Sequence, residues 1–442
     1  MSDERTHEHR AGTGVPVRRV VAHVVRGPEA ATASGERIVV GSARDCDLVV
    51  GDRTVSRYHA ELEAAHGGIR VRDLGSTNGL AIGGVRVTAA IVPCGAVIEL
   101  GAAAVRVEDA EVATETSSRA ESLGDLTARA PTTRRLVARI EKAAASDASI
   151  VITGEPGTGK ELVARTLHAT SGRAGGPFVV VDCGALAGPL VASELFGHER
   201  GAFTDADERR TGAFERAHGG TLVLDDVTEL PPDVQPMLLG ALERRAARRV
   251  GGRDEVAFDV RVIAIASRDL RAEVNAGRFR LDLYYRIAVV KLDVPALRDR
   301  IDDLPILVAR FLEERGEGVA HALLAEERVA ELVARDWPGN VRELRNVVEA
   351  ALAMGEIEPG AGSEPVGEGD ASAASTEALI ESLLDVPYKD ARQRFSRALE
   401  HAYCSDLARR ARGVTSVAAR LAGLDRSQLR QLLARAGVAI RA

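Results

Sequence analysis

Cysteine is scarce in this chain of 442 residues, and its four copies are far apart with no CxxC pair, at Cys46, Cys94, Cys183 and Cys404. This spacing excludes a disulfide framework and a cysteine-based zinc site, and it fits a reducing compartment. Long apolar runs are lacking as well, since no stretch approaches the roughly 18 residues that cross a membrane, and the N-terminus is polar rather than signal-like. We therefore expect a cytoplasmic protein.

Lysine is the other rare residue, because arginine supplies nearly all of the 58 basic side chains. The net charge of −7 is small for the length and excludes nothing by itself. The chain is 45% hydrophobic and 28% charged, which is ordinary for a globular protein. Its length allows about three domains.

The stretch 154–160 matches the phosphate-loop pattern GxxxxGK and follows an apolar run at 150–152, with helical spacing after it. Strand, glycine turn and helix form the context in which this pattern binds phosphate. Backbone N–H groups close around the oxygens, and the lysine ammonium reaches the outer phosphates. The alternative is a chance glycine turn. The pattern predicts a nucleotide site built from Gly154, Glu155, Pro156, Gly157, Thr158, Gly159, Lys160 and Glu161.

A second nucleotide element is the apolar run 221–224, which ends in Asp225 and Asp226. In this arrangement Asp225 would hold Mg²⁺ and Asp226 would orient the attacking water. The alternative is an exposed turn. Strands and helices alternate from 123 to 357, so we expect an α/β nucleotide-binding domain around a parallel sheet.

Five stretches stand in a characteristic order: GEPGTGKELVA (154–164), SELFGHERGAFTDA (193–206), GGTLVLDD (219–226), FRLDLYYRI (279–287) and WPGNVRELRN (337–346). Through these motifs, residues 123–355 resemble the AAA+ domain of bacterial sigma-54-dependent transcription activators, also called enhancer-binding proteins. In that family, ATP hydrolysis in a ring, often a hexamer, drives a loop against sigma-54 and opens the promoter. The resemblance implies that the chain binds ATP and Mg²⁺, forms homo-oligomers and contacts sigma-54 RNA polymerase.

The resemblance also implies roles for individual residues. Arg280 and Arg286 would be arginine fingers that reach a neighbouring subunit's site and stabilise charge on the transferred phosphoryl group. Arg342 would read the nucleotide from a helical lid. The loop that touches sigma-54 would be Gly201, Ala202, Phe203, Thr204, Asp205 and Ala206.

Several positions depart from the family pattern. Asp205 replaces a glycine of the loop tip, which costs backbone freedom. Asp226 stands for a glutamate, and Asp182 stands for the asparagine that would pair with it, so two facing carboxylates would repel unless one is protonated or a cation bridges them. Glu161 replaces a hydroxyl that would bind magnesium, and Ala266-Ser267 replaces a Thr-Asn sensor.

The N-terminal region reads as a disordered tail over 1–16, a β-sandwich of short alternating strands over 17–110, and a linker over 111–122. This region contains the stretches VSRYH (55–59) and DLGSTNG (73–79). Through these motifs the sandwich resembles a forkhead-associated (FHA) domain, and the resemblance implies a phosphothreonine protein or a Ser/Thr kinase as partner. The alternative is a docking module without phosphate binding. Ser42 stands where the family has a phosphate-binding arginine. The implied binding residues are Ser56, Arg57, Thr77 and Asn78, braced by His59.

A Gly-, Ala- and Ser-rich flexible linker is expected over 358–378, followed by an all-α segment over 379–442. Two short helices around Gly423 predict a helix-turn-helix that resembles a Fis-type domain. Residues 409–442 carry eight arginines against one acidic residue, which favours DNA as partner over a dimerisation helix alone. The major-groove residues would be Arg426, Ser427, Gln428, Arg430 and Gln431.

Two functions remain open at this point. The first is an ATP-driven, sigma-54-dependent regulator that binds upstream DNA and receives a Ser/Thr phosphorylation signal. The second is a DNA-bound scaffold that binds ATP without hydrolysing it and recruits a phosphoprotein. The departures at Asp182, Asp205, Asp226 and Ala266-Ser267 discriminate between them.

Overall fold

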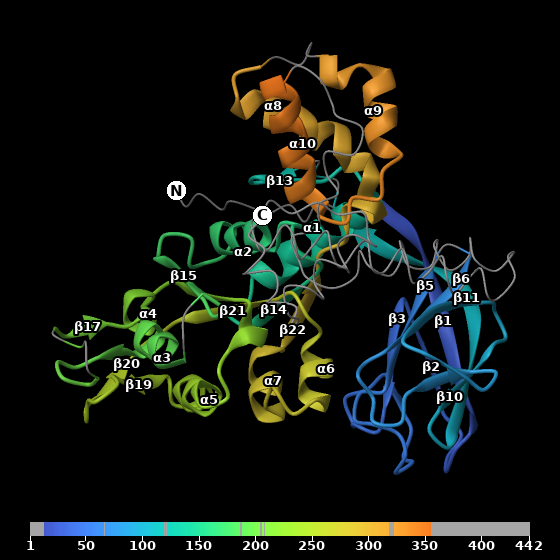
Figure 1. Cartoon of the computed structure of the whole chain (residues 1–442), viewed down its shortest axis with the longest axis horizontal. Helices are drawn as coiled ribbons and strands as arrows, with labels where there is room; N and C mark the ends of the chain where they lie inside the picture. The colour runs from blue at the N-terminus through green and yellow to red at the C-terminus, as the bar shows by residue number, and fades with distance from the viewer. Residues whose placement is uncertain are drawn as a thin grey trace, which may run out of the picture. The chain divides into compact units, whose positions relative to one another are not determined.

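The computed structural model describes residues 13–65, 67–118, 120, 122–185, 188–203, 206, 208–317 and 322–354 (Figure 1). The expected C-terminal linker and helix-turn-helix lie outside the described residues. The same is true of Thr204 and Asp205 at the loop tip. No helix in the described part of the chain is long and apolar enough to span a membrane.

The N-terminal region is a sandwich of two sheets, as the alternating strands predict. Ile38, Val40, Leu62 and Val105 are among the side chains that fill the space between the sheets. The first sheet has the order β2 (Thr32–Gly35), β1 (Thr13–Arg26), β11 (Ala103–Ser117), β10 (Val97–Leu100), β7 (Leu80–Ile82) and β8 (Val85–Val87). The second has the order β4 (Leu48–Val49), β3 (Arg37–Gly41), β5 (Ala60–Ala65), β6 (Gly68–Asp73) and β9 (Ala89–Val92).

The two long strands of this sandwich change the expected boundaries. β1 begins at Thr13, inside the segment expected to be a tail, and β11 continues to Ser117, inside the segment expected to be a linker. Thr13 is paired with Ser117 at the end of the antiparallel ladder. Each segment therefore supplies the backbone partner that the other one lacks, a pairing that polar composition alone does not reveal.

The central region is the expected parallel α/β sheet. Its strands have the order β15 (Phe178–Asp182), β18 (Thr221–Asp225), β21 (Arg261–Ala266), β14 (Ile150–Thr153) and β22 (Val290–Asp293). Every residue of β21 is buried, as expected for a strand covered on both faces. Because the strands are parallel, the carboxyl ends of β14, β18 and β21 meet at one edge.

Helices and hairpins surround this sheet (Figure 1). The helices are α1 (Pro131–Ala144), α2 (Lys160–Ala169), α3 (Gly188–Phe196), α4 (Ala213–Arg216), α5 (Val234–Arg244), α6 (Leu270–Asn275) and α7 (Leu281–Ile287), with the 3-10 turn η1 (Val227–Glu229). The hairpins are β12 (Ser122–Leu123) with β13 (Leu126–Thr127), β16 (Gly197–His198) with β17 (Arg210–Thr211), and β19 (Ala246–Arg248) with β20 (Glu255–Ala257).

A helical lid follows β22 and has an apolar cluster of its own. Trp337 is fully buried in this cluster beside Leu344 and Val348. The lid elements are η2 (Leu297–Asp303), α8 (Leu304–Glu314), η3 (Ala322–Leu324), α9 (Glu326–Val333) and α10 (Asn340–Met354).

Candidate functional site

The phosphate loop joins β14 to α2 and depends on glycine at three positions. Gly154, Gly157 and Gly159 have φ values of 151°, 77° and 98°. A Cβ on Gly154 would lie 2.7 Å from the carbonyl oxygen of Val294. The loop therefore presents its backbone at the N-terminus of α2, where N–H groups and the helix dipole favour an anion.

Lys160 turns its ammonium into this loop. Its Nζ donates hydrogen bonds to the carbonyl oxygens of Gly154, at 2.8 Å, and of Glu155, at 3.1 Å. Burial lowers the pKa of Lys160, while the carboxylates of Asp226 and Asp225 act to raise it. The ammonium is thus held by two backbone carbonyl oxygens beside the glycine turn.

Three carboxylates lie at the neighbouring ends of β15, which ends at Asp182, and β18, which ends at Asp225 and is followed by Asp226. Burial raises the pKa of Asp225, and the charges of Asp226 and Asp182 raise it further. Asp226 has left-handed backbone angles (φ 48°, ψ 52°), and its Oδ1 is buried without a hydrogen-bond partner among the described residues. Oδ1 of Asp182 accepts N–H groups of Gly184 and Ala185 at 2.9 and 3.0 Å, so this carboxylate also shapes its own loop. Its pairing with Asp226 stays a prediction.

The structure shows the surroundings of two other departures from the family pattern, Glu161 and Ala266. Glu161 faces outward and pairs with Arg165 one helical turn later, at 2.7 Å. Ala266 ends β21 with its side chain fully buried, so it offers the site no polar group. Glu161 and Ala266 therefore do not supply the hydroxyl or amide groups that the family pattern has at these positions.

Residues of the helical lid form hydrogen bonds with the phosphate loop. Asn340 is fully buried, and its Nδ2 donates to Glu155 Oε2 and to the carbonyl oxygen of Pro156, both at 3.1 Å. Its Oδ1 accepts the N–H of Leu297 at 2.8 Å. Arg298 donates to Glu155 Oε2 at 2.9 Å, and this hydrogen bond is the chief reason that the pKa of Glu155 is lowered.

Three lid contacts complete the clamp. The carbonyl oxygen of Gly157 accepts the N–H of Val341 at 3.0 Å, and that of Thr158 accepts a guanidinium N–H of buried Arg300 at 2.5 Å. Arg342 follows Val341, and its backbone N–H also donates to the carbonyl oxygen of Gly157, at 3.3 Å. Its role as a nucleotide sensor stays a prediction. Sequence reasoning missed Arg298, Arg300 and Asn340; the polar residue within WPGN was the only signal for the last.

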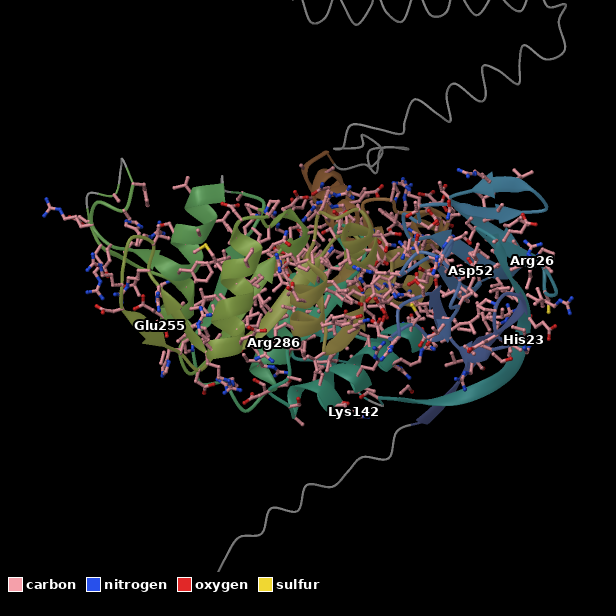
Figure 2. All side chains as sticks on the ribbon, turned by 90° about the horizontal axis from the view of Figure 1, so that it is seen from below. His23, Arg26, Asp52, Lys142, Glu255 and Arg286 are labelled. Atoms are coloured by element: carbon pink, nitrogen blue, oxygen red, sulfur yellow. The ribbon has the colours of Figure 1, made fainter. Side chains whose placement is uncertain are left out.

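The two arginines proposed as fingers lie on α7. Arg280 is the N-cap residue of this helix and pairs with Asp282 at 2.7 Å on an exposed surface. Arg286, labelled in Figure 2, donates to the carbonyl oxygen of Leu242 at 2.8 Å. These contacts lie away from the chain's own phosphate loop.

The expected sigma-54 loop is described at its base. The N–H of Gly201 donates to the carbonyl oxygen of Ala206 at 2.8 Å, so the two ends of the loop meet. The Phe203 ring packs edge-on against His198, with ring centroids 4.9 Å apart. Ala202 precedes it in the same turn.

The FHA-like loops come together at one end of the sandwich. Ser56 Oγ accepts the N–H of Thr77 at 2.9 Å, and Asn78 Nδ2 donates to the carbonyl oxygen of Thr54 at 2.8 Å. The side chain of Arg57, the next residue after Ser56, is exposed. Hydrogen bonds thus bring Ser56 and Thr77 together, and a shared role of the four residues stays a prediction.

His59 lies beneath this surface and links its loops. The buried ring accepts the N–H of Ser56 at 3.1 Å through Nδ1, and its Nε2 lies 3.0 Å from the carbonyl oxygen of Gly79. Burial lowers the pKa of His59. Ser42, which stands in place of an arginine, donates its backbone N–H to the carbonyl oxygen of Ser56 at 3.0 Å and adds no charge.

Comparison with protein families assigns three parts of the chain. Residues 126–293 match the family described as sigma-54 interaction domain, and residues 298–359 match the AAA+ ATPase lid domain. Residues 23–111 match the family described as inner membrane component of T3SS, cytoplasmic domain. The first two matches cover the phosphate loop, the three carboxylates and the lid residues that contact the loop.

Relatives of known name share the central region. The transcriptional regulatory protein ZraR of Escherichia coli K12 is 46% identical over 56% of this chain and 55% of that protein. The response regulator PilR of Pseudomonas aeruginosa is 45% identical over 60% and 59%. The chain thus spans little more than half the length of the curated relatives that it matches. A crystal structure of NtrX from Brucella abortus in complex with ATP is 36% identical over 71% of this chain and 70% of that one, with a TM-score of 0.49.

Proposed function

Since the central region of this chain belongs to the sigma-54 activator family, we propose that the protein is a sigma-54-dependent transcription regulator driven by ATP. It binds ATP at the phosphate loop, hydrolyses it in a ring oligomer and remodels sigma-54 RNA polymerase. The observation that carries the proposal is the convergence of the glycine cradle, Lys160, Asp225 and the lid residue Asn340 at one edge of the sheet.

The residues present fit a magnesium nucleotide. Mg²⁺ supplies positive charge that stabilises the transferred phosphoryl group, and Asp225 is the residue that would hold it. The high pKa of Asp225 reflects a carboxylate that is buried among other carboxylates, and a nearby cation favours its charged form. Asp226 has an Oδ1 that is buried without a partner among the described residues, and in this proposal its carboxylate orients the attacking water. Arg280 and Arg286 of one subunit complete the site of the next.

In this proposal the C-terminal region selects the DNA site, and the N-terminal sandwich receives a phosphorylation signal. Residues 379–442 bind upstream DNA as a dimer, through the arginine-rich second helix that the sequence predicts. The sandwich binds a phosphothreonine protein, such as a Ser/Thr kinase or its substrate, at the surface formed by Ser56, Arg57, Thr77 and Asn78. The bonding of both loops to His59 supports this role, because it preorganises the polar groups.

A second function is favoured by the carboxylates of the site. Asp226 is one methylene shorter than glutamate, and Asp182 adds negative charge where an amide is expected. If these changes stop the chemistry, the protein is an ATP-binding scaffold on DNA that recruits a phosphoprotein. The two functions differ in ATP turnover, not in ATP binding.

The test is ATP turnover by the full chain and by Lys160→Ala, over a range of protein concentrations. Turnover per subunit that rises with concentration and vanishes in Lys160→Ala supports the regulator, since fingers act between subunits. Nucleotide binding without turnover supports the scaffold. Absence of nucleotide binding by the unmodified chain would contradict both.

A further inference from the structure

The sandwich and the ATPase share one apolar cluster. Strand β3 reads Ile38-Val39-Val40, and while its neighbours face the sandwich interior, Val39 packs with the ATPase residues. The described parts of both regions lie in one compact unit that ends at Ser363. From the sandwich, Cys46, Tyr58 and Leu74 join Val39; from the ATPase, the cluster includes Ala266, Leu270, Val274, Leu283, Tyr284 and Ile287.

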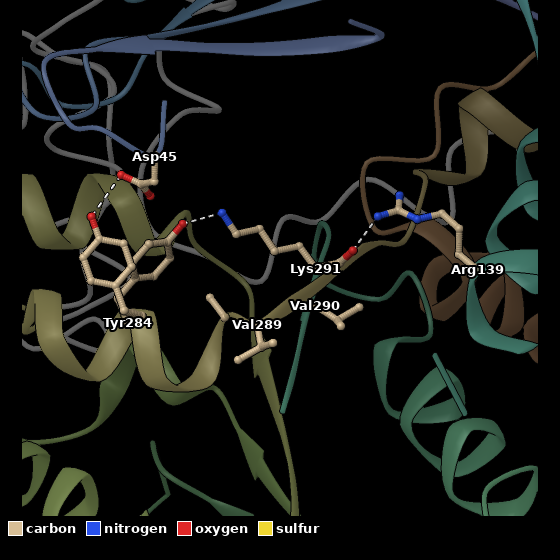
Figure 3. Close-up of a pocket in the computed structure, with 8 residues that line it drawn as sticks. Asp45, Arg139, Tyr284, Val289, Val290 and Lys291 are labelled. Carbon is tan, nitrogen blue, oxygen red and sulfur yellow. Dashed lines mark hydrogen bonds between the residues drawn. The ribbon is translucent and has the colours of Figure 1, made fainter. Parts of the chain in front are cut away.

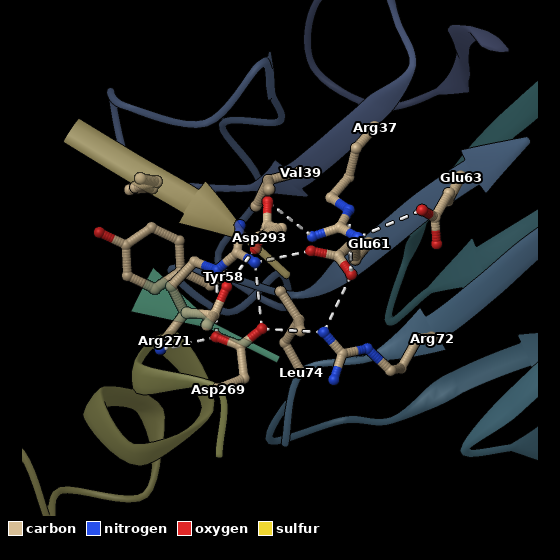
Figure 4. A network of polar contacts seen from close by, with 12 residues as sticks. Arg37, Val39, Tyr58, Glu61, Glu63, Arg72, Leu74, Asp269, Arg271 and Asp293 are labelled. Atoms are coloured by element: carbon tan, nitrogen blue, oxygen red, sulfur yellow. Dashed lines mark hydrogen bonds and ion pairs between the residues drawn. The ribbon is translucent and has the colours of Figure 1, made fainter. Parts of the chain in front are cut away.

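Beside this cluster lies an ion-pair network (Figure 4). Glu61 of β5 has only 6% of its side chain exposed and accepts from Arg271 at 2.6 Å and from Arg72 at 2.9 Å. Arg72 also lies 2.9 Å from Asp269, so each charge has a partner in the other region. Arg37 extends the network to Asp293 at 3.2 Å. Buried charges that are fully paired hold a geometry, because losing one partner leaves the other charge uncompensated.

The third contact joins the phosphopeptide loops to α6. Nδ2 of Asn275, the last residue of α6, donates to the backbone carbonyl oxygens of Tyr58 and of Leu74, the latter at 2.9 Å. These carbonyls belong to the two loops that His59 links. Asn275 therefore connects the proposed phosphothreonine surface to the ATPase through backbone.

The fourth contact involves α7 itself. Tyr285 OH donates to Asp45 Oδ1 at 2.9 Å, and the Tyr284 and Tyr58 rings meet edge-on at 5.8 Å. A cavity of about 520 Å³ opens along this contact, and Asp45, Tyr284 and Lys291 are among the residues that line it (Figure 3). α7 is thus held along the face that carries these tyrosines.

Helices α6 and α7 are six and seven residues long, and helices this short are stabilised by packing rather than by their own hydrogen bonds. Arg280 caps α7 and Arg286 lies in its last turn. We propose that the docked sandwich is a positioning element for α7, so that it supports the finger-dependent ATP turnover rather than repressing it. This inference rests on the proposed ATPase function. In it, Asn275 and Arg271 are positioning residues and contact no nucleotide.

The test uses the full chain with Arg271→Ala and Asn275→Ala, and Arg315→Ala as the matched control. Arg315 forms an exposed ion pair with Glu349 in the lid, away from the docking contacts. We expect the two docking variants to lower kcat by roughly tenfold to 100-fold, as misplaced catalytic groups do, with nucleotide affinity unchanged. The control should keep both values.

Cys46 reports docking independently of activity. It is buried in the shared cluster, and burial raises the pKa of its thiol to about 12. In a Cys94→Ser, Cys404→Ser background, alkylation of Cys46 followed by mass spectrometry should be slow, and each docking variant should accelerate it.

The results separate the two proposals. Turnover that is unchanged or higher in Arg271→Ala and Asn275→Ala overturns the supporting role of the sandwich, while leaving the ATPase proposal intact if Lys160→Ala is inactive. If the unmodified chain shows no turnover, the ATPase proposal fails, and the supporting role fails with it. Cys46 reactivity that no docking variant changes overturns the docking contacts themselves.

Discussion

Asn340 and Glu155 are 185 residues apart in the chain, yet Nδ2 of the first donates to Oε2 of the second at 3.1 Å. Asn340 has a left-handed backbone (φ 55°), which asparagine tolerates better than most residues. The same side chain also accepts the N–H of Leu297, where the lid begins. One amide at the start of α10 therefore joins the phosphate loop to the start of the lid at Leu297.

Replacing this amide should loosen the lid. Asn340→Ala leaves the buried Leu297 N–H without its acceptor, and we expect about 2 kcal/mol of lost stability together with weaker nucleotide binding. Urea unfolding and nucleotide titration measure the two effects. Glu349→Ala, which breaks an exposed lid ion pair, is the control and should stay within about 0.5 kcal/mol. Equal nucleotide affinity in the two variants would contradict the clamp.

Asp226 should be needed for turnover but not for binding. Asp226→Asn keeps the shape and the left-handed backbone, while it removes the charged acceptor. We expect kcat to fall by about 100-fold, the usual contribution of a positioned base, with nucleotide affinity retained. Steady-state turnover beside equilibrium nucleotide binding makes the comparison. A variant as active as the parent would show that Asp226 does not handle the water proton.

Asp226→Glu addresses the scaffold alternative. Glutamate restores the longer side chain of the family but fits a left-handed φ less well than aspartate, so we expect a stability loss of about 1 kcal/mol. If the parent chain is inactive and this variant turns over ATP, the shorter carboxylate is the cause of the inactivity. If the parent is active, the variant should change kcat little.

Local patterns were enough to predict the local structure around the phosphate loop and Asp225. The glycines at Gly154 and Gly157 permit the turn before the helix that begins at Lys160, and Asp225 ends a strand because the run before it is apolar. The roles of these residues toward a nucleotide stay predictions. The lid contacts of Arg298 and Arg300 were not predictable, because their partners are backbone and side-chain groups more than a hundred residues earlier.

The docking contacts could be predicted only in part from the sequence. In β3, Ile38 and Val40 face the sandwich interior, while Val39 between them packs with the ATPase residues. The strand is therefore apolar on both faces, which an isolated sandwich does not need. Glu61 is the converse case, because it is a charged residue between Ala60 and Leu62 that is nevertheless buried. Sequence alone shows that these positions are unusual; only the tertiary structure supplies α6 and α7 as the reason.

The ion-pair network should make the free energy of unfolding depend on pH in the acidic range. Burial alone would raise the pKa of Asp269, but the charges of Arg271 and Arg72 outweigh it and lower the pKa from 3.8 to about 2. A carboxyl whose folded pKa is depressed contributes stability above its unfolded pKa and loses it as pH falls toward the folded value. We expect about 2 kcal/mol from Asp269 to disappear between pH 3.8 and about 2. Urea midpoints against pH should fall less steeply for Asp269→Asn than for the parent; parallel curves would contradict this contribution.

His59 should control the phosphothreonine surface from beneath. His59→Ala leaves the N–H of Ser56 without its side-chain acceptor and removes the link to Gly79, so both loops lose their fixed spacing. We expect about 1 to 3 kcal/mol of lost stability in the sandwich and a loss of phosphothreonine binding. A pool of phosphothreonine peptides, with the unphosphorylated pool as reference, measures retention on the immobilised full chain. Arg57→Ala is the companion variant, because its exposed side chain should matter for the phosphate and not for the fold. Retention of phosphorylated peptides that survives Arg57→Ala, or that the unphosphorylated pool matches, would make the sandwich a docking module alone, held to α6 and α7 and without a phosphate signal.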